Sequence, residues 1–127
     1  MAQVYLQGKA CQLGGELPET GRQAPDFLLV STRLKDMNLA SFADSKKLIY
    51  TVPSLDTMVC AKTTKTLNEL AVGWDNMNVL VVSADLPFAQ QRFIKQHKLK
   101  NITALSMMRN KQFAIDYGVL LMDGSLA

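Results

Sequence analysis

The uninterrupted apolar run Val-Leu-Val-Val at residues 79–82 most constrains how this chain can fold. A strand with one face in water alternates apolar and polar residues, whereas a strand covered on both faces does not. Apolar residues recur with the period of a helix before this run, over residues 59–74, and again after it, over residues 88–97. Helix, buried strand and helix in this order predict an α/β sheet with parallel central strands and right-handed crossovers.

Further strands, a third helix and an N-terminal hairpin complete the expected elements. Turn residues and apolar runs predict a hairpin with strands at 4–6 and 10–13 around a Gly8-Lys9 turn, strands at 26–30, 46–52, 102–105 and 119–122, and a helix at 110–117. The first helix is expected to bury one stripe of side chains, namely Val59, Thr63, Leu67, Leu70, Ala71 and Trp74. The strand at 119–122 turns at Asp123-Gly124, and no partner strand for it is evident in the sequence.

Length and charge narrow the class of protein. The 127 residues suit a single domain spanning 1–127. Fourteen basic and 11 acidic side chains give a net charge of +3. We interpret the basic residues between 92 and 111 as a solvated surface, and we expect no nucleic-acid partner. No apolar run approaches the roughly 18 residues of a membrane span, and the N-terminus lacks a secretory signal pattern, so no membrane association is expected.

The cysteines and the histidine exclude two further classes. Cys11 and Cys60 are too few for a disulfide-stapled secreted scaffold. Together with the lone His97 they form no zinc-binding set, and no metal is expected. We therefore expect a cytoplasmic protein.

Cys60 follows a proline and a threonine at the head of the first predicted helix. If Thr57 is the N-cap, Cys60 lies in the first turn, where free N–H groups and the positive helix end stabilise a thiolate. The Thr57 hydroxyl is then near enough to the sulfur to orient a small polar ligand. Position alone is equally consistent with a small, buried, unreactive cysteine beside a helix cap.

The residues around Cys60 resemble the active-site signature of the peroxiredoxins. The segment Val-Pro-Ser-Leu-Asp-Thr-Met-Val-Cys at 52–60 is similar to the thiol peroxidase subfamily in particular. Two further blocks follow in the same order, Ser-Ala-Asp-Leu-Pro-Phe-Ala-Gln at 83–90 and a segment at 109–119. The resemblance covers nearly the whole chain. It implies a thioredoxin-like fold, in which helices flank a central mixed sheet, with an N-terminal β-hairpin.

The same resemblance implies a thiol-dependent peroxidase that reduces hydrogen peroxide and alkyl hydroperoxides. Carried over by motif, Cys60 is the peroxidatic nucleophile, Thr57 hydrogen-bonds and orients the peroxide, and Pro53 shields the sulfur from bulk water. No cofactor is implied. The expected partners are the peroxide, a thioredoxin-type or small-thiol reductant and a second copy of the chain in a homodimer.

The sequence departs from the subfamily in two places. The resemblance to this subfamily implies an atypical two-cysteine mechanism with a second, resolving cysteine. In this sequence the position of that cysteine holds Ile94, and the other cysteine, Cys11, lies in the predicted hairpin. The chain also stops before the subfamily's last two strands and closing helix, which include a thiolate-stabilising arginine; neither Arg92 nor Arg109 is assigned that role. These departures leave one alternative open, a catalytically weak thioredoxin-fold redox sensor or binding protein.

Overall fold

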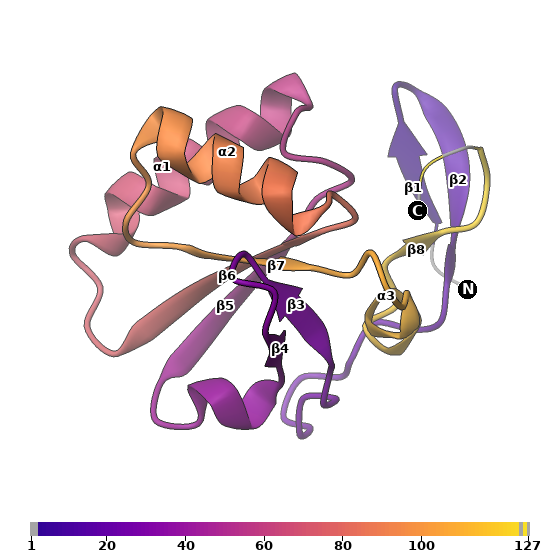
Figure 1. Cartoon of the computed structure of the whole chain (residues 1–127). Helices are drawn as coiled ribbons and strands as arrows, with labels where there is room; N and C mark the ends of the chain where they lie inside the picture. Colours follow the sequence, from indigo (N-terminus) through magenta and orange to yellow (C-terminus); the bar gives the residue numbers. More distant parts are fainter. Residues whose placement is uncertain (1–2, 125, 127) are drawn as a thin grey trace.

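Two sheets organise the chain in the computed structural model of Figure 1, which describes residues 3–124 and residue 126. The larger sheet has the strand order β4-β3-β7-β6-β5, and the smaller has the order β1-β2-β8. The strands are β1 (Gln3–Leu6), β2 (Lys9–Gly14), β3 (Leu29–Ser31), β4 (Asp36–Met37), β5 (Lys46–Thr51), β6 (Met77–Ser83), β7 (Thr103–Ser106) and β8 (Leu120–Leu121). The helices are η1 (Leu39–Phe42, 3-10), α1 (Met58–Ala71), α2 (Pro87–His97) and α3 (Gln112–Asp116).

The middle of the larger sheet is parallel, as the sequence predicts. Strand β6 pairs in parallel with β5 on one side and with β7 on the other, and β3 runs antiparallel to β7. Helices α1 and α2 provide the two crossovers and lie over the same face of the sheet (Figure 1). Pro87 begins α2, where its missing N–H costs no hydrogen bond. The carboxyl ends of β5 and β6 therefore lie side by side, and each leads into a helix.

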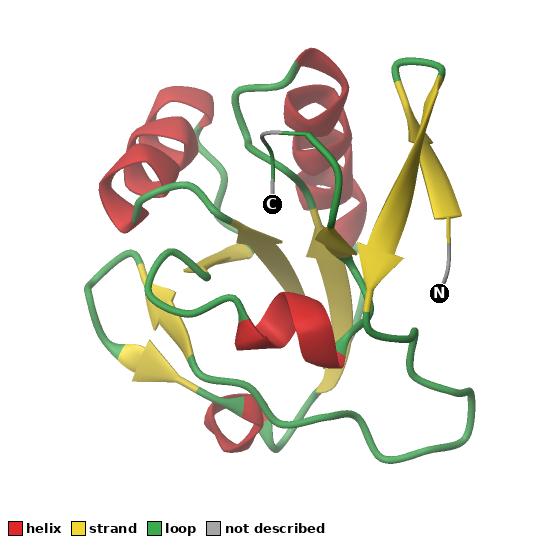
Figure 2. Cartoon of the chain, turned by 90° about the vertical axis from the view of Figure 1, so that its right-hand side faces the viewer, coloured by secondary structure: helices red, strands yellow, loops and turns green. Residues whose placement is uncertain are grey.

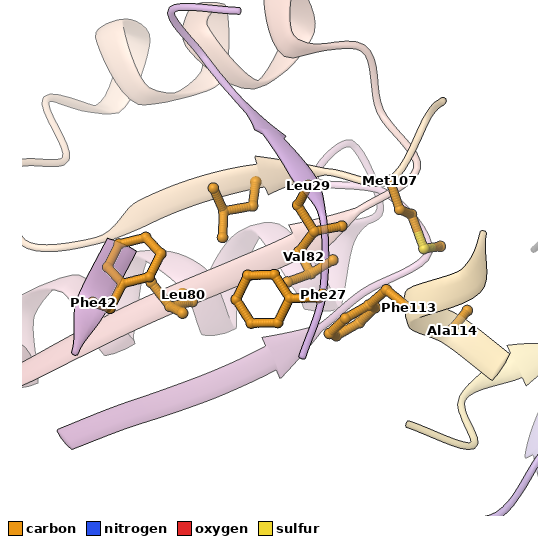
Figure 3. Packing of buried hydrophobic residues seen from close by; sticks show 9 residues of the cluster. Phe27, Leu29, Phe42, Leu80, Val82, Met107, Phe113 and Ala114 are labelled. Carbon is orange, nitrogen blue, oxygen red and sulfur yellow. The ribbon is translucent and has the colours of Figure 1, made fainter. Parts of the chain in front are cut away.

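The residues of β6 alternate between two hydrophobic clusters, which explains the unbroken apolar run. Val79 and Val81 face α1 and α2 and contribute to one cluster, called here the helix-side core. Leu80 and Val82 contribute to the other on the opposite face. Figure 3 shows this second cluster, in which Leu80 and Val82 lie among side chains from β3, η1, β7 and α3 and from the segment before β3.

The face of α1 that meets the sheet is rotated from the predicted stripe. Val59 and Leu70 were expected in the core, but they are 74% and 54% exposed. The fully buried residue of this helix is Thr64, whose hydroxyl donates to the Cys60 carbonyl at 2.7 Å. That internal hydrogen bond satisfies the hydroxyl and lets a polar residue face the core. A prediction from hydrophobic periodicity assigns Val59 to the core because it counts Thr64 as polar and therefore as exposed.

The hairpin differs from the prediction by one residue at its turn. Leu6 pairs with Lys9, so the turn residues are Gln7 and Gly8, with φ values of 51° and 80°. Two consecutive positive φ values give the tight two-residue turn that matches strand twist. Figure 2 shows the hairpin strands beside the larger sheet rather than within it.

Strand β8 has a partner, contrary to the sequence-based expectation. It pairs antiparallel with β2, placing Leu121 opposite Leu13. The Asp123 carboxylate extends the contact by accepting from the Gln12 N–H at 2.7 Å. The pairing joins segments from opposite ends of the described chain. Local sequence patterns do not predict a contact between segments so far apart.

Close backbone contact holds the hairpin against α3. Gly15 and Gly118 both adopt positive φ, 74° and 67°, and face each other's segments. A Cβ on Gly15 would lie 2.0 Å from the Ile115 carbonyl oxygen. A Cβ on Gly118 would lie 2.3 Å from the Glu16 carbonyl carbon. Only glycine fits either position.

Two smaller differences concern the segment before β5. The strand expected at 26–30 begins only at Leu29, because the Asp26 carboxylate accepts from the N–H groups of Phe27 and Leu39 instead. Strand β4 and η1 were not predicted. The Asn38 side chain accepts from the Ser41 N–H and starts η1 with a capping box.

Candidate active site

The segment from β5 to α1 runs along the carboxyl edge of the larger sheet. The Val52 N–H donates to the Val82 carbonyl at 3.0 Å, which continues the pairing of β5 with β6 by one residue. Pro53 then ends the strand and is half-buried. Leu55 anchors the following turn because its side chain is buried in the helix-side core.

The Asp85 carboxylate fixes this turn to the end of β6. One of its oxygens accepts from the Ser54 hydroxyl at 2.6 Å, and the other accepts from the Leu55 N–H at 2.8 Å and the Ser83 hydroxyl at 2.9 Å. Gln90, fully buried in α2, donates to the same Ser83 hydroxyl at 3.0 Å. The residues before α1 are thus held by hydrogen bonds to a charged acceptor, which are stronger than neutral ones. We call this arrangement the Asp85 clamp.

Thr57 and Cys60 occupy the helix positions that the sequence predicts. Thr57 is the N-cap, with extended φ and ψ of −74° and 143°, and Cys60 is the third residue of α1. An N-cap threonine usually accepts a hydrogen bond from an N–H of the first turn, but the Thr57 side chain makes no such bond. The Thr57 hydroxyl instead donates to the Ser54 carbonyl at 2.9 Å. That bond tightens the turn held by the Asp85 clamp, and the Thr57 side chain leaves the Cys60 N–H unoccupied.

Cys60 is half-buried and lies between two environments. Its side chain packs against the helix-side core. Met58 and Val59, which precede it, are 87% and 74% exposed. The exposure of Met58 excludes a role for its side chain in the core. A small molecule can therefore approach the head of α1 from solvent, while the sulfur keeps an apolar surrounding on its inner side.

Pro53 also borders an apolar cavity of about 210 Å³ on the sheet face opposite α1. Val82, Met107 and Phe113 from the second cluster contribute to its lining. Leu13 of β2 and Leu121 of β8 close it from the smaller sheet. Pro53 thus belongs both to the lining of this cavity and to the segment that leads to Thr57.

Cys11 and Ile94, which occupies the position of the subfamily's resolving cysteine, lie in different parts of the fold. Both cysteines are free, and Cys11 is buried in β2, paired with Val4 of the hairpin. Ile94, on α2, packs in the helix-side core alongside Cys60. Arg109 forms an exposed ion pair of 3.0 Å with Asp36.

The described residues contain no group of three His, Cys, Asp or Glu side chains arranged to hold a metal ion. Among the same residues, none of the helices combines the length and the apolar character that crossing a bilayer requires.

Sequence reasoning missed the Asp85 clamp. Asp85 lies in the block at 83–90, which resembles the subfamily but predicts no role for this residue. Its position carried a usable signal, because an acidic residue directly after a buried parallel strand lies at the same sheet edge as the end of the neighbouring strand.

Comparison with known proteins agrees with this geometry. The family model described as Redoxin matches residues 19–127. A thiol peroxidase from Leptospira interrogans is 40% identical over 128 residues, which cover 99% of this chain and 75% of that protein.

Two solved structures are similar over most of the chain. A peroxiredoxin-like protein from Aquifex aeolicus superposes with a TM-score of 0.89 at 38% identity, covering 97% of this chain and 71% of its own. A thiol peroxidase from Chromobacterium violaceum also gives 0.89, at 28% identity, over 95% of this chain and 70% of its own. These likenesses confirm the predicted thioredoxin-like α/β fold. The chain belongs to the redoxin family and, within it, to the thiol peroxidases.

Proposed function

We propose that Cys60 is the nucleophile of this thiol-dependent peroxidase, that Thr57 orients the peroxide and that Pro53 restricts the access of water to the sulfur. The observation that carries the proposal is the place of Cys60 at the third residue of α1, one turn beyond Thr57. The free N–H groups and positive end of the helix favour an anionic sulfur there. The proposed substrates are hydrogen peroxide and alkyl hydroperoxides.

In the first step the Cys60 thiolate attacks one peroxide oxygen, so that an S–O bond forms as the O–O bond breaks. Sulfur loses two electrons and becomes a sulfenic acid, and the other oxygen leaves as alkoxide or hydroxide and takes a proton from solvent. The Thr57 hydroxyl donates to Ser54 and keeps lone pairs free to accept from the peroxide O–H. The Cys60 N–H donates to the oxygen on which charge develops.

An external thiol then completes the proposed cycle. It condenses with the sulfenic acid to give a mixed disulfide and water, and a second thiol attacks that disulfide and restores Cys60. Ile94 supplies no sulfur, and Cys11 is buried in the other sheet. We therefore assign the second half of the cycle to a thioredoxin-type dithiol or a small thiol.

Rapid mixing of the reduced protein with one equivalent of peroxide tests the assignment. We expect fast loss of one thiol in the wild type and in Cys11→Ser, and none in Cys60→Ser. Mass spectrometry of the product is expected to show one added oxygen. Loss of two hydrogens with a Cys11–Cys60 linkage would instead make Cys11 a resolving residue and refute the external-thiol step.

The second candidate function is a redox sensor or binding protein with slow turnover, and the presence of Ile94 favours it. The two functions differ in rate. A reaction of Cys60 with peroxide no faster than that of free cysteine supports the sensor, whereas a much faster reaction followed by turnover with thioredoxin or a small thiol supports the peroxidase.

We further propose a homodimer, formed through exposed apolar side chains at the heads of α1 and α2. Met58 and Val59 lie on α1, and Phe88, 67% exposed, lies on α2. Large apolar side chains left in water are stabilised when a second copy of the chain covers them. We expect Phe88→Glu to weaken association in sedimentation, whereas Ile115→Glu, at an exposed apolar position on α3, leaves it unchanged.

The two free cysteines support a reducing, cytoplasmic location. We also propose that residues 1–127 act as one domain, since Val119 and Leu120, which lead into the smaller sheet, pack against the core of the larger one. Limited proteolysis that released a stable fragment would contradict this second proposal.

A further inference from the structure

Gln90 is a fully buried polar residue to which neither the motif nor the mechanism above gives a role. It is the fourth residue of α2, and its side chain is completely excluded from solvent. Its Nε2 group donates to the Ser83 hydroxyl at 3.0 Å and to the Leu105 carbonyl at 2.9 Å. One side-chain amide thus joins α2 to the carboxyl ends of β6 and β7.

These two contacts fix which way the amide of Gln90 points. The Leu105 carbonyl can only accept, so the NH₂ group must face it, and both hydrogens of that group are used. The amide oxygen is buried and has no hydrogen-bond partner among the described residues. An unpaired buried acceptor costs stability, and a methionine would fill a similar volume without that cost. Stability alone therefore does not explain an amide at this position.

The amide of Gln90 also sets the direction of the next hydrogen bond. An NH₂ group does not accept, so the single proton of the Ser83 hydroxyl goes to the Asp85 carboxylate, 2.9 Å away. The same carboxylate accepts from the Ser54 hydroxyl at 2.6 Å, and the Ser54 carbonyl accepts from the Thr57 hydroxyl at 2.9 Å. A continuous series of hydrogen-bonded residues therefore leads from α2 to the residue proposed to orient the peroxide.

We propose that Gln90 is a positioning residue for the peroxide reaction, whose amide orients Ser83 toward Asp85 and through them holds the turn that carries Thr57. The inference rests on the roles proposed above for Cys60 and Thr57. Gln90 acts only through other residues and transfers no proton. Hydrogen bonds in series polarise one another, so loss of the first weakens those that follow.

Gln90→Met tests the proposal by removing both donors while keeping a side chain of similar length. The net strength of an ordinary hydrogen bond corresponds to roughly 2- to 10-fold in rate, so we expect the reaction of Cys60 with peroxide to slow by about that factor. The matched control is Phe42→Leu, which alters a buried side chain of the opposite cluster. The control is expected to lose stability but to react at the wild-type rate.

Alkylation separates positioning from a general disturbance of the site. The Cys60 thiolate attacks iodoacetamide without help from the Thr57 hydroxyl, so this reaction reports only on the sulfur. We expect Gln90→Met to be alkylated at the wild-type rate while it reacts more slowly with peroxide. A merely structural effect would not divide the two reactions in this way.

A double-mutant comparison tests whether Gln90 acts through Ser83. In Ser83→Ala the link is already broken, so adding Gln90→Met should slow the peroxide reaction by less than about twofold, because the effects of residues in one hydrogen-bond network are not additive. If Gln90→Met fails to fold, Gln90→Glu takes its place. It keeps the shape of the side chain but has at most one hydrogen to donate, and we expect the same division between peroxide and iodoacetamide.

A wild-type peroxide rate in the folded Gln90 variant, an equal loss of its alkylation rate, or the full loss again in the Ser83→Ala background would each overturn the inference. None of these results touches the assignment of Cys60, which fails only if Cys60→Ser still loses a thiol to peroxide. A wild-type rate in Thr57→Val would refute the role of Thr57 and the inference with it.

Discussion

Replacing Asp85 tests whether the clamp at the sheet edge holds the active-site turn in place. In Asp85→Ala three hydrogen bonds to a charged acceptor are lost, at 2.6, 2.8 and 2.9 Å. The hydroxyls of Ser54 and Ser83 can turn to other partners, but the Leu55 N–H cannot. An unpaired donor costs about 1–3 kcal/mol, and the lost charged bonds add to it, so we expect unfolding free energy to fall by about 3–5 kcal/mol.

Asp85→Asn refines this prediction. The amide oxygen can still accept from Leu55 and Ser83, and its NH₂ can donate to Ser54, so mainly the charge assistance disappears. We expect a smaller loss, about 1–2 kcal/mol. Urea denaturation followed by circular dichroism measures both variants. Asp116→Asn is the control. Among the described residues that carboxylate accepts a hydrogen bond only from the exposed Gln112 side chain, so the unfolding free energy should fall by no more than about 0.5 kcal/mol.

The same variants should slow the reaction of Cys60 with peroxide. A displacement of about 1 Å in a positioned group can reduce a rate by about 100-fold, and Asp85→Ala frees the turn that leads to Thr57. We expect an effect of about 10- to 100-fold, with Asp85→Asn between it and the wild type. If Asp85→Ala is no less stable than Asp116→Asn, the clamp does not stabilise the fold; if it is destabilised yet reacts at the wild-type rate, the clamp does not position Thr57.

Gly118→Ala should lower the unfolding free energy by about 3 kcal/mol or more, because positive φ and a 2.3 Å contact both oppose a Cβ; Gly21→Ala, with φ of 86° but open space, should cost only about 1 kcal/mol. Thr57→Val should slow the peroxide reaction by about 30- to 1000-fold, whereas Thr66→Val, which removes a hydroxyl that donates to a helix carbonyl, should not; equal rates in both would refute the role of Thr57. Burial, followed by two nearby carboxylates, raises the pKa of Tyr117, so the folded state binds its proton more tightly than the unfolded state. The resulting stabilisation is complete below about pH 10 and is lost as pH rises further, and Tyr117→Phe should flatten that alkaline decline in melting temperature.

The order of elements could be predicted because it depends on local patterns. The buried run of β6, the proline at the start of α2 and the spacing from Thr57 to Cys60 each leave a signature within a few residues. The resemblance of the motif added the family, and the comparisons confirmed it.

Contacts between distant segments could not be predicted in this way. The pairing of β2 with β8 and the contact between Gly15 and Gly118 depend on how the whole chain closes. The local sequence allows the Thr57 hydroxyl to accept from the first turn of α1, but in the structure it donates to the Ser54 carbonyl and makes no cap hydrogen bond. Side-chain competition of this kind is decided by tertiary packing rather than by the local sequence.

The pairing of β2 with β8 has a consequence for the order of folding. Its hydrogen bond from Gln12 to Asp123 spans 111 residues, whereas β5, β6 and β7 are joined through consecutive crossovers. Contacts of long sequence separation form slowly because the loop must close before they stabilise anything. During synthesis, β2 therefore cannot complete its pairing until β8 has left the ribosome. The smaller sheet should form last and, in native-state hydrogen exchange, open first.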